Sequence, residues 1–331
     1  METVAGFAQA DIEAARDAAG VGGTVFFPAG TYPVADLVAN VQGQTWVLDR
    51  SATILRTGGG PLLSLQASGL RLRGGTWDGG RTPSDLSNGF DGFFSPDAED
   101  LTLQNISGWG MCLQGGVLVL RNCLLRNIGY AAILWLAPGW VCQGPVIEGC
   151  TIDRSIGFVS QGGIHIRSAE APGAGWVQAP RIVNTNVILP VCPNVAQIAA
   201  GAPFKNAVGI EVWSGLGAII SGCQVAGGKI GTSFGNCRNS KVLGCDVGSA
   251  FQYGIEVAGL GAGAGSLWCV VEGNSVNSVS GQGTGASAPS RAVSISGASL
   301  NTKVIGNSLY WSTYGVGINS DCTGTVNQFN G

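Results

Sequence analysis

The sequence predicts an all-β fold, a parallel β-helix (solenoid) with a short N-terminal capping helix. The 55 glycines follow no collagen-like period and alternate with Val, Ile and Leu, which indicates many tight turns between short strands. A short motif recurs about every 22 to 37 residues, and helical patterning is nearly absent after residue 20. With 331 residues and 45% hydrophobic content, the chain can bury a large core.

The recurring motif is aliphatic-x-Gly/Asn-Cys/Asn-x-aliphatic, as in LRNCLL, IEGCTI and VEGNSV. Its anchors are Cys123, Cys150, Cys223, Cys245, Asn274 and Asn307. The interval between Cys150 and Cys223 is doubled, and Asn186 in VNTNVI is expected to divide it. Stacked in successive coils, the thiols should fill small buried sites and the amides should form a hydrogen-bonded ladder, which we favour over metal binding.

A second β-branched run occurs in most repeats. The runs are GGIHIRS (162–168), VGIEVWS (208–214), YGIEVAG (253–259), RAVSISG (291–297) and YGVGINS (314–320), with KIGTSFG (229–235) as a weak copy. Because these runs are short and no helices separate them, each is expected to stack on its copy one coil away. Parallel sheets with coils about 4.8 Å apart follow.

The N-terminal stretch AQADIEAARDAA (8–19) is the one strong helical segment, and the open end of a coil stack needs such a cover. We expect residues 1–36 to form the cap helix and first strand, and residues 37–331 to form one continuous β-helix. The C-terminal TGTVNQFNG offers no comparable cap. A partner covering the last coil, or a chain that continues, would solve this.

Charge and composition exclude several functions. Charged residues make up 11% of the chain. With 17 basic against 20 acidic side chains, the chain lacks the positive electrostatic field that attracts nucleic acid. No apolar run is long enough for membrane insertion, and the first residues lack the pattern of a secretion signal. Without such a signal, and with no C-x-x-C pair, the ten cysteines are expected to be reduced.

The segments GGTVFFPAGTYPV (22–34), directly after the helix, and GGTWDGG (74–80) resemble the pectate-lyase-like single-stranded right-handed β-helix proteins. This superfamily includes polygalacturonases, pectate lyases and bacteriophage tailspike depolymerases. The resemblance covers nearly the whole chain and implies a right-handed solenoid. It says less about chemistry, because the scaffold hosts hydrolases, lyases, epimerases and binding proteins.

The catalytic signatures of two of these groups are missing. The polygalacturonase-like Asn-Thr-Asp appears as Asn184-Thr185-Asn186, no Asp-Asp pair exists, and the strands carry no calcium-binding aspartate cluster like that of pectate lyases. The resemblance that remains is to tailspikes, whose acids vary in position and whose chains lack secretion signals. It implies a polysaccharide ligand, a homotrimer and a place on a phage virion or another extracellular site of action.

The candidate catalytic residues share one slot of the second strand. Glu211 and Glu256 fill it in two GIEV segments, and His165 fills it in GIHI. Since the flanking aliphatic residues should face the core, these three side chains should face outward. Glu211 and Glu256 are separated by the weak copy and so by about 9.6 Å at the backbone. Carboxyl groups roughly 6.5 to 9.5 Å apart suit inverting glycoside hydrolysis.

Three further residues are candidates for substrate binding. Trp213 offers a face on which a sugar ring can stack, Arg167 can bind an acidic sugar, and Tyr253 widens the surface. The alternative is that all of these residues are solvated positions on an outward sheet face. The inserts 171–180 and 190–205 flank the His165 and Glu211 strands and are expected to wall a groove.

The segment 78–100 is a second acidic candidate. Its acids are Asp78, Asp85, Asp91, Asp97, Glu99 and Asp100. Their spacing matches no EF-hand loop, so a solvated loop is the preferred interpretation over calcium binding.

The first functional hypothesis is a tailspike-like protein that binds and hydrolyses a polysaccharide on its parallel-sheet face, with Glu211 and Glu256 as the acid/base pair and His165 assisting. The alternatives are a non-catalytic receptor-binding or structural β-helix and a polysaccharide lyase. No cofactor or metal is predicted.

Overall fold

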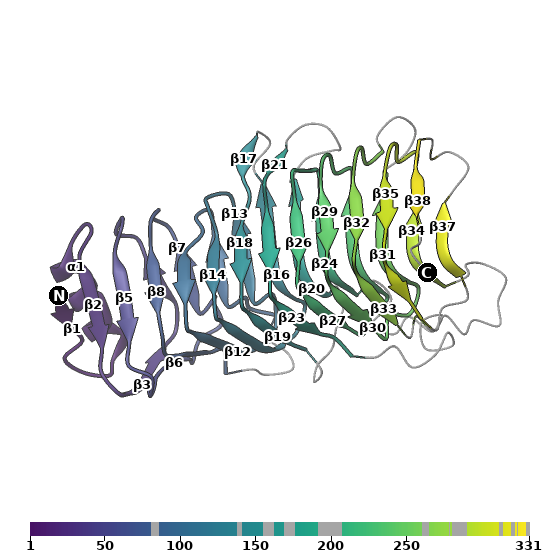
Figure 1. Ribbon diagram of the computed structural model, residues 1–331. Helices are drawn as coiled ribbons and strands as arrows, with labels where there is room; N and C mark the ends of the chain where they lie inside the picture. Colours follow the sequence, from purple (N-terminus) through teal and green to yellow (C-terminus); the bar gives the residue numbers. More distant parts are fainter. Residues whose placement is uncertain are drawn as a thin grey trace.

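The chain forms an elongated stack of coils, with the N-terminus at one end and the C-terminus near the other (Figure 1). The computed structural model describes residues 1–80, 86–137, 141–154, 162–168, 176–190, 207–259, 265–277, 279, 290–310, 314–318, 322 and 324–328. Within these ranges, three long sheets form the faces of the solenoid and a three-stranded sheet lies beside them. All of the strand pairs between coils are parallel, which confirms the predicted parallel β-helix.

Sheet A is the longest of the three faces. Its strands are β1 (Glu2–Thr3), β2 (Thr24–Phe27), β5 (Thr45–Leu48), β8 (Arg71–Arg73), β11 (Asp97–Glu99), β14 (Val119–Arg121), β18 (Val146–Glu148), β22 (Arg181–Val183), β26 (Ile219–Ser221), β29 (Lys241–Leu243), β32 (Val270–Glu272), β35 (Lys303–Ile305) and β38 (Val326–Gln328).

Sheet B follows sheet A in each coil. Its strands are β3 (Gly30–Val34), β6 (Ala52–Arg56), β9 (Thr76–Asp78), β12 (Thr102–Ile106), β15 (Leu124–Ile128), β19 (Thr151–Asp153), β23 (Asn186–Ile188), β27 (Gln224–Ala226), β30 (Asp246–Gly248), β33 (Ser275–Asn277) and β36 (Ser308–Leu309).

Sheet C carries the strands that contain the candidate site. They are β4 (Leu37–Ala39), β7 (Leu63–Leu65), β10 (Phe90–Gly92), β13 (Met111–Gln114), β16 (Ala131–Ala137), β20 (Gly162–Ser168), β24 (Val208–Trp213), β28 (Ile230–Gly235), β31 (Tyr253–Ala258), β34 (Arg291–Ile295) and β37 (Tyr314–Ile318). The small sheet D joins β17 (Cys142–Gln143), β21 (Val177–Gln178) and β25 (Gly215–Leu216).

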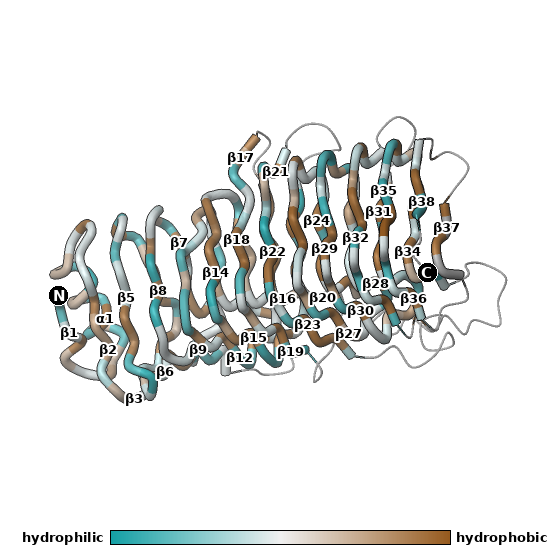
Figure 2. The backbone as a smooth tube through the Cα atoms, in the orientation of Figure 1, coloured by the Kyte–Doolittle hydropathy of each residue, from teal (hydrophilic) through white to brown (hydrophobic). Residues whose placement is uncertain are grey.

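The core is one continuous column of inward side chains from all three long sheets. Hydrophobic residues alternate with polar ones along the strands, because successive side chains of a strand face opposite sides (Figure 2). Trp46, Trp77 and Trp135 are among the largest side chains that are completely buried.

The repeated motif marks the corner between sheets A and B. Its Gly/Asn position has a left-handed backbone, with φ of 53° at Asn122, 63° at Gly149 and 57° at Gly244. Glycine and asparagine adopt this conformation at the least cost, which explains why the motif contains them. The next residue turns inward: Cys123 and Cys150 are each 1% exposed.

The prediction that Asn186 is the inward anchor of the repeated motif in its coil was wrong. Asn186 pairs with Thr151 and Gln224, the residues that follow the anchors, so the buried member of this coil is Thr185. Any small side chain can fill this inward position, so the hydroxyl of Thr185 takes the place of the thiol found in other coils.

The expected amide ladder is present near the C-terminal coils. The side-chain amide of Asn274 donates to Oδ1 of Asn307 over 2.8 Å, and its own Oδ1 accepts the backbone N–H of Cys245 over 2.9 Å. All nine described cysteines are free thiols, and seven of them are buried, including the four cysteine anchors of the motif.

The predicted cap helix is α1 (Gln9–Ala19). It contacts β1, β2 and β3 and buries Ile12 and Ala15. The side-chain amide of Gln44, in the next coil, donates to the carbonyls of Arg16 and Gly20 and fixes the end of the helix. In the described part of the chain, no helix has both the length and the apolar character that crossing a membrane would require.

Glycines line the corner between sheets B and C. At Gly163, Gly209, Gly231 and Gly254, an added Cβ would overlap a Cγ1 atom of a valine in sheet B and a backbone carbonyl of the next coil. The chain therefore needs glycine here to bring the sheets together.

We predict that Gly209→Ala lowers the free energy of unfolding by about 1–3 kcal/mol, because its Cβ would overlap Val225 and the carbonyl of Gly231. Urea unfolding measures the change. Gly59→Ala is the matched control, since nothing lies within 4 Å of the added atom. Equal stabilities of the two variants would contradict this account of the corner.

Candidate functional site

The predicted catalytic residues lie in one column on the outer side of sheet C. His165 pairs with Glu211, Glu211 with Ser233, and Ser233 with Glu256. The weak copy 229–235 is strand β28, which places one coil between the two glutamates, as the repeat predicts. The next member beyond Glu256 is Ser294.

Glu211 is held by two basic side chains from the preceding strand. Nδ1 of His165 lies 2.6 Å from Oε2 of Glu211, and Nε of Arg167 donates to the same oxygen over 2.7 Å. Since an ionised carboxylate can only accept, the proton of the first bond belongs to Nδ1, and the 3.2 Å contact of the same Nδ1 with Nη2 of Arg167 is then not a hydrogen bond. These contacts fix the position of one carboxylate oxygen.

The surroundings of Glu211 keep it ionised. Burial alone would raise the pKa of this carboxyl group, but the hydrogen bond and charge of His165, together with those of Arg167, outweigh burial and lower the pKa below its ordinary value. Glu211 is therefore a carboxylate at neutral pH.

Glu256 lies in the opposite environment. Burial raises the pKa of this carboxyl group, and the negative charge of Glu211 raises it further. The hydrogen bond that Ser233 donates to Oε2 of Glu256 over 2.9 Å and the charge of Lys229 lower it, but by less. The pKa of Glu256 therefore lies above its ordinary value, so Glu256 takes up a proton at a higher pH than Glu211 does.

The interpretation of these positions as a solvated sheet face was wrong for two of them. His165 is 1% exposed and Glu211 is 5% exposed, although both face away from the core. Glu256 is half-buried. The alternation of the strand sets the direction of a side chain, but it does not reveal what covers the outer face.

Trp213 and Arg167 come together at the end of their strands. The guanidinium of Arg167 lies 4.9 Å from the centre of the Trp213 ring, a cation–π distance. The indole extends over Gly235 in the next strand, where a Cβ would come within 2.9 Å of its Cδ1 and Nε1 atoms. Trp213 is half-buried, and 33% of the Arg167 side chain is exposed.

Tyr253 is not part of this group. It begins β31, whereas Trp213 ends β24, so in a parallel sheet the two lie at opposite edges. Three residues that the sequence reasoning missed do belong to the site: Ser233, Lys229 and Gly235. All three lie in the weak copy, where aligning the repeats position by position could have found them.

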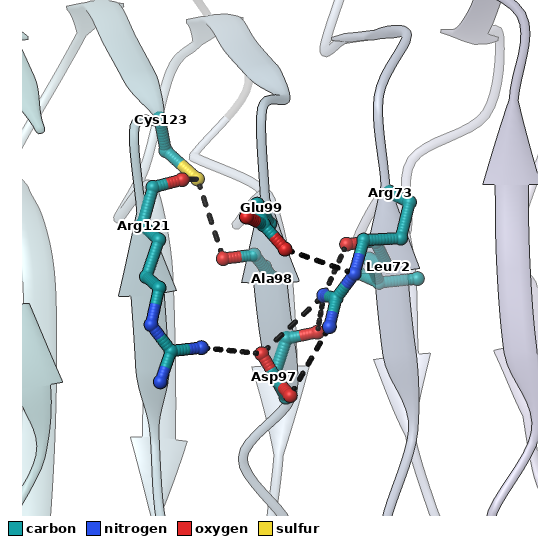
Figure 3. Close-up of polar contacts among 7 residues, drawn as sticks. All are labelled: Leu72, Arg73, Asp97, Ala98, Glu99, Arg121 and Cys123. Atoms are coloured by element: carbon teal, nitrogen blue, oxygen red, sulfur yellow. Dashed lines mark hydrogen bonds and ion pairs between the residues drawn. The ribbon is translucent and has the colours of Figure 1, made fainter.

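The acidic segment 78–100 does not converge on one point. Asp78 accepts hydrogen bonds from Gln104 and Asn105 in sheet B, and Asp91 accepts one from Asn88 at sheet C. Asp97 lies in sheet A between Arg73 and Arg121, with nitrogen–oxygen distances of 3.2 and 3.5 Å (Figure 3).

Arg73 also contacts Glu99 over 3.3 Å in this network. Asp78, Asp91, Asp97 and Glu99 lie in strands β9, β10 and β11, so the interpretation of these acids as parts of a solvated loop was wrong. Across the described ranges, no three His, Cys, Asp or Glu side chains form a group that could hold a metal ion. Asp85 lies outside the described residues, as do 171–175 and 191–206, which make up most of the two predicted wall inserts.

The two glutamates should give opposite pH dependences of stability. At pH 7 we expect Glu211→Gln to lower the free energy of unfolding by about 1–3 kcal/mol, since the basic partners lose a carboxylate. The pKa of Glu211 is lowered on folding, so this loss shrinks as the pH falls below 4.5, the ordinary value.

The pKa of Glu256 is raised on folding, so the stabilisation from its neutral form is present below pH 4.5 and is lost as the pH rises toward the raised value. The wild type should therefore lose stability relative to Glu256→Gln as the pH rises. Urea unfolding of both variants across this range measures the trends. The same pH trend in both would contradict the assignment.

Comparison with known proteins gives structural matches alone. No protein-family model matches the chain, and neither does any curated protein sequence. The mannuronan C-5 epimerase AlgE4 A-module of Azotobacter vinelandii matches with a TM-score of 0.57 and 15% identity, over 96% of this chain and 95% of that chain.

Two further solved structures match with similar scores. The Agl-KA catalytic domain gives a TM-score of 0.54 at 13% identity, over 97% of this chain and 65% of its own. The catalytic domain of a GH87 α-1,3-glucanase gives 0.51 at 10% identity, over 93% and 65%. Identities this low show a fold and no chemistry. The chain shares the right-handed parallel β-helix fold of these solved structures, as its sequence predicts.

Proposed function

We propose that the outer face of sheet C binds a polysaccharide and hydrolyses it, with Glu256 as the general acid and Glu211 as the general base. One observation carries the proposal: two carboxyl groups share a column, and their pKa values are displaced in opposite directions. Paired groups whose environments separate their pKa values are typical of an acid and a base that work together.

The proposed reaction inverts the anomeric centre. Neutral Glu256 donates its proton to the leaving glycosidic oxygen, while the Glu211 carboxylate takes a proton from the water that attacks the opposite face of the sugar. With one coil between them, the backbones of the two glutamates are about 9.6 Å apart, and the carboxyl groups of inverting enzymes are about 6.5 to 9.5 Å apart.

The neighbouring side chains have supporting roles in this proposal. His165 and Arg167 keep Glu211 ionised and fix one of its oxygens. Ser233 orients Glu256 through its hydrogen bond. The partly exposed Trp213 and Arg167 offer a stacking surface and a cation to a sugar residue.

The comparisons fit a polysaccharide substrate. The solved structures that share the fold include a mannuronan epimerase module and an α-1,3-glucanase catalytic domain, and both names denote enzymes that act on polysaccharides. Of the two, the glucanase is the one whose name implies hydrolysis.

A glycan-binding protein without catalytic activity is the second candidate. The low exposure of Glu211 favours it, because a general base must reach a water molecule. A polysaccharide lyase is the third, and its unsaturated products would distinguish it.

Cleavage of bacterial and plant polysaccharides tests the proposal. Hydrolysis creates new reducing ends without absorbance from unsaturated uronides, and Glu211→Gln and Glu256→Gln should each lower the rate by about 10² to 10⁴-fold. Glu272→Gln, at an exposed glutamate of sheet A, is the control. The rate should peak between the lowered pKa of Glu211 and the raised pKa of Glu256. Unsaturated products would identify a lyase, and full activity in both variants would refute these roles.

Because its sequence resembles tailspikes, we also propose that the chain forms a homotrimer and belongs to a phage virion. Sedimentation equilibrium of the purified chain should give three times the monomer mass of 33.6 kDa. A monomer at all concentrations would remove the support for a tailspike.

A further inference from the structure

The corner where sheet C passes into sheet A borders the candidate site. We call it the ridge and define it by residues 176–179, 214–218, 236–240, 265–269 and 298–302. These segments come from successive coils and are aligned by parallel pairing: Val177 with Gly215, and Leu216 with Arg238, which in turn pairs with Leu267. The ridge runs along the edge that carries β21 in Figure 1.

One residue of the ridge has an unfavourable backbone. The five residues at its turn all have positive φ: 46° at Ala179, 70° at Gly217, 50° at Asn239, 53° at Trp268 and 54° at Asn301. Four of them are small or are asparagine. A bulky aromatic residue is strained in this region, so Trp268 is the exception.

Burial does not compensate for this strain. Trp268 is 53% exposed, and it is one of the large hydrophobic residues that are exposed in the described part of the chain. Strained residues persist where the surrounding structure forces them, and they concentrate at functional sites. An exposed, strained tryptophan therefore points to a ligand outside the chain.

A second tryptophan of the ridge is already stacked on a cation. The guanidinium of Arg238 lies 4.7 Å from the centre of the Trp176 ring. The residue after Trp176, Val177, donates its N–H to the carbonyl of Ser214 over 2.9 Å, and Ser214 follows Trp213 in the chain. The ridge thus continues from the end of the candidate site.

Arg238 and Trp268 come from neighbouring coils, since Arg238 pairs with Leu267, and Trp176 and Trp213 come from the two coils before them, at earlier positions of the turn. Neighbouring coils are about 4.8 Å apart, close to the length of one sugar residue in an extended glycan. Each of these planar groups can stack on a sugar ring.

The rest of the ridge is polar without being charged. Arg238 is the one charged residue in the five segments, and the exposed amides Asn239 and Asn301 occupy the same position of the turn as Trp268, in the two neighbouring coils. Amides can bond hydroxyl groups in both directions, as donors and as acceptors. This combination fits a glycan better than it fits a charged partner.

We infer that the ridge is a second polysaccharide-binding site, which holds an extended glycan along the solenoid axis, with Trp268 as its exposed anchor. The site is distinct from the column of His165, Glu211 and Glu256. The inference shares its ligand class with the proposed function but needs none of the catalytic roles. Its function is to retain long chains beside sheet C.

The test uses Trp268→Asn, which places at this turn the residue found at Asn239 and Asn301. Because asparagine tolerates a positive φ, the variant should melt at or above the wild-type Tm. In native gels that contain alginate, polygalacturonate, dextran or laminarin, the wild type should be retarded by at least one polymer, and Trp268→Asn should raise the dissociation constant at least fivefold. Trp176→Ala should act in the same direction.

Tyr310→Asn is the control, because Tyr310 is 57% exposed and lies outside the ridge. All variants are made in the Glu256→Gln background, so that binding is measured without cleavage. If hydrolysis fails but Trp268→Asn still weakens retardation, the ridge stands and the catalytic proposal falls. Three outcomes overturn the ridge: no retardation of the wild type by any polymer, equal retardation of Trp268→Asn and Tyr310→Asn, or a change in oligomeric mass without a change in binding.

Discussion

Backbone hydrogen bonding between successive coils determines everything else in this molecule. Each strand of sheets A, B and C pairs in parallel register with its counterpart one coil away. A residue that recurs at one position of the repeat is thereby placed in a column with a spacing of about 4.8 Å. Cysteine and asparagine columns fill the core in this way, and the same rule assembles His165, Glu211 and Glu256 on the outer face from segments far apart in the sequence.

The column also explains how two identical side chains acquire different properties. Glu211 lies beside a strand that supplies His165 and Arg167, and these lower its pKa despite burial. Glu256 lies beside Ser233, whose hydroxyl is too weak a partner to offset burial and the charge of Glu211. The difference between the two neighbouring strands, and not the glutamates themselves, creates the candidate acid/base pair.

The repeat predicted the fold and the order of the site well, because pairing in register is a local and regular rule. It placed the weak copy between the two glutamates and the cap helix at the N-terminus. It could not predict that His165 and Glu211 are almost fully buried although they face outward, since alternation sets only the direction of a side chain. The error at Asn186 arose because threonine fills the small inward position as well as cysteine does. The acids of 78–100 were misjudged because the chain turns twice within that segment.

The central claim is that their different environments give Glu211 and Glu256 different pKa values. A titration followed by NMR tests this claim most directly. In protein with ¹³C at the glutamate carboxyl carbons, Glu211→Gln and Glu256→Gln assign the two signals. The account predicts that Glu211 stays ionised below pH 4.5, whereas Glu256 takes up its proton above pH 4.5. Titration of both at the ordinary value, or in the reverse order, would contradict it.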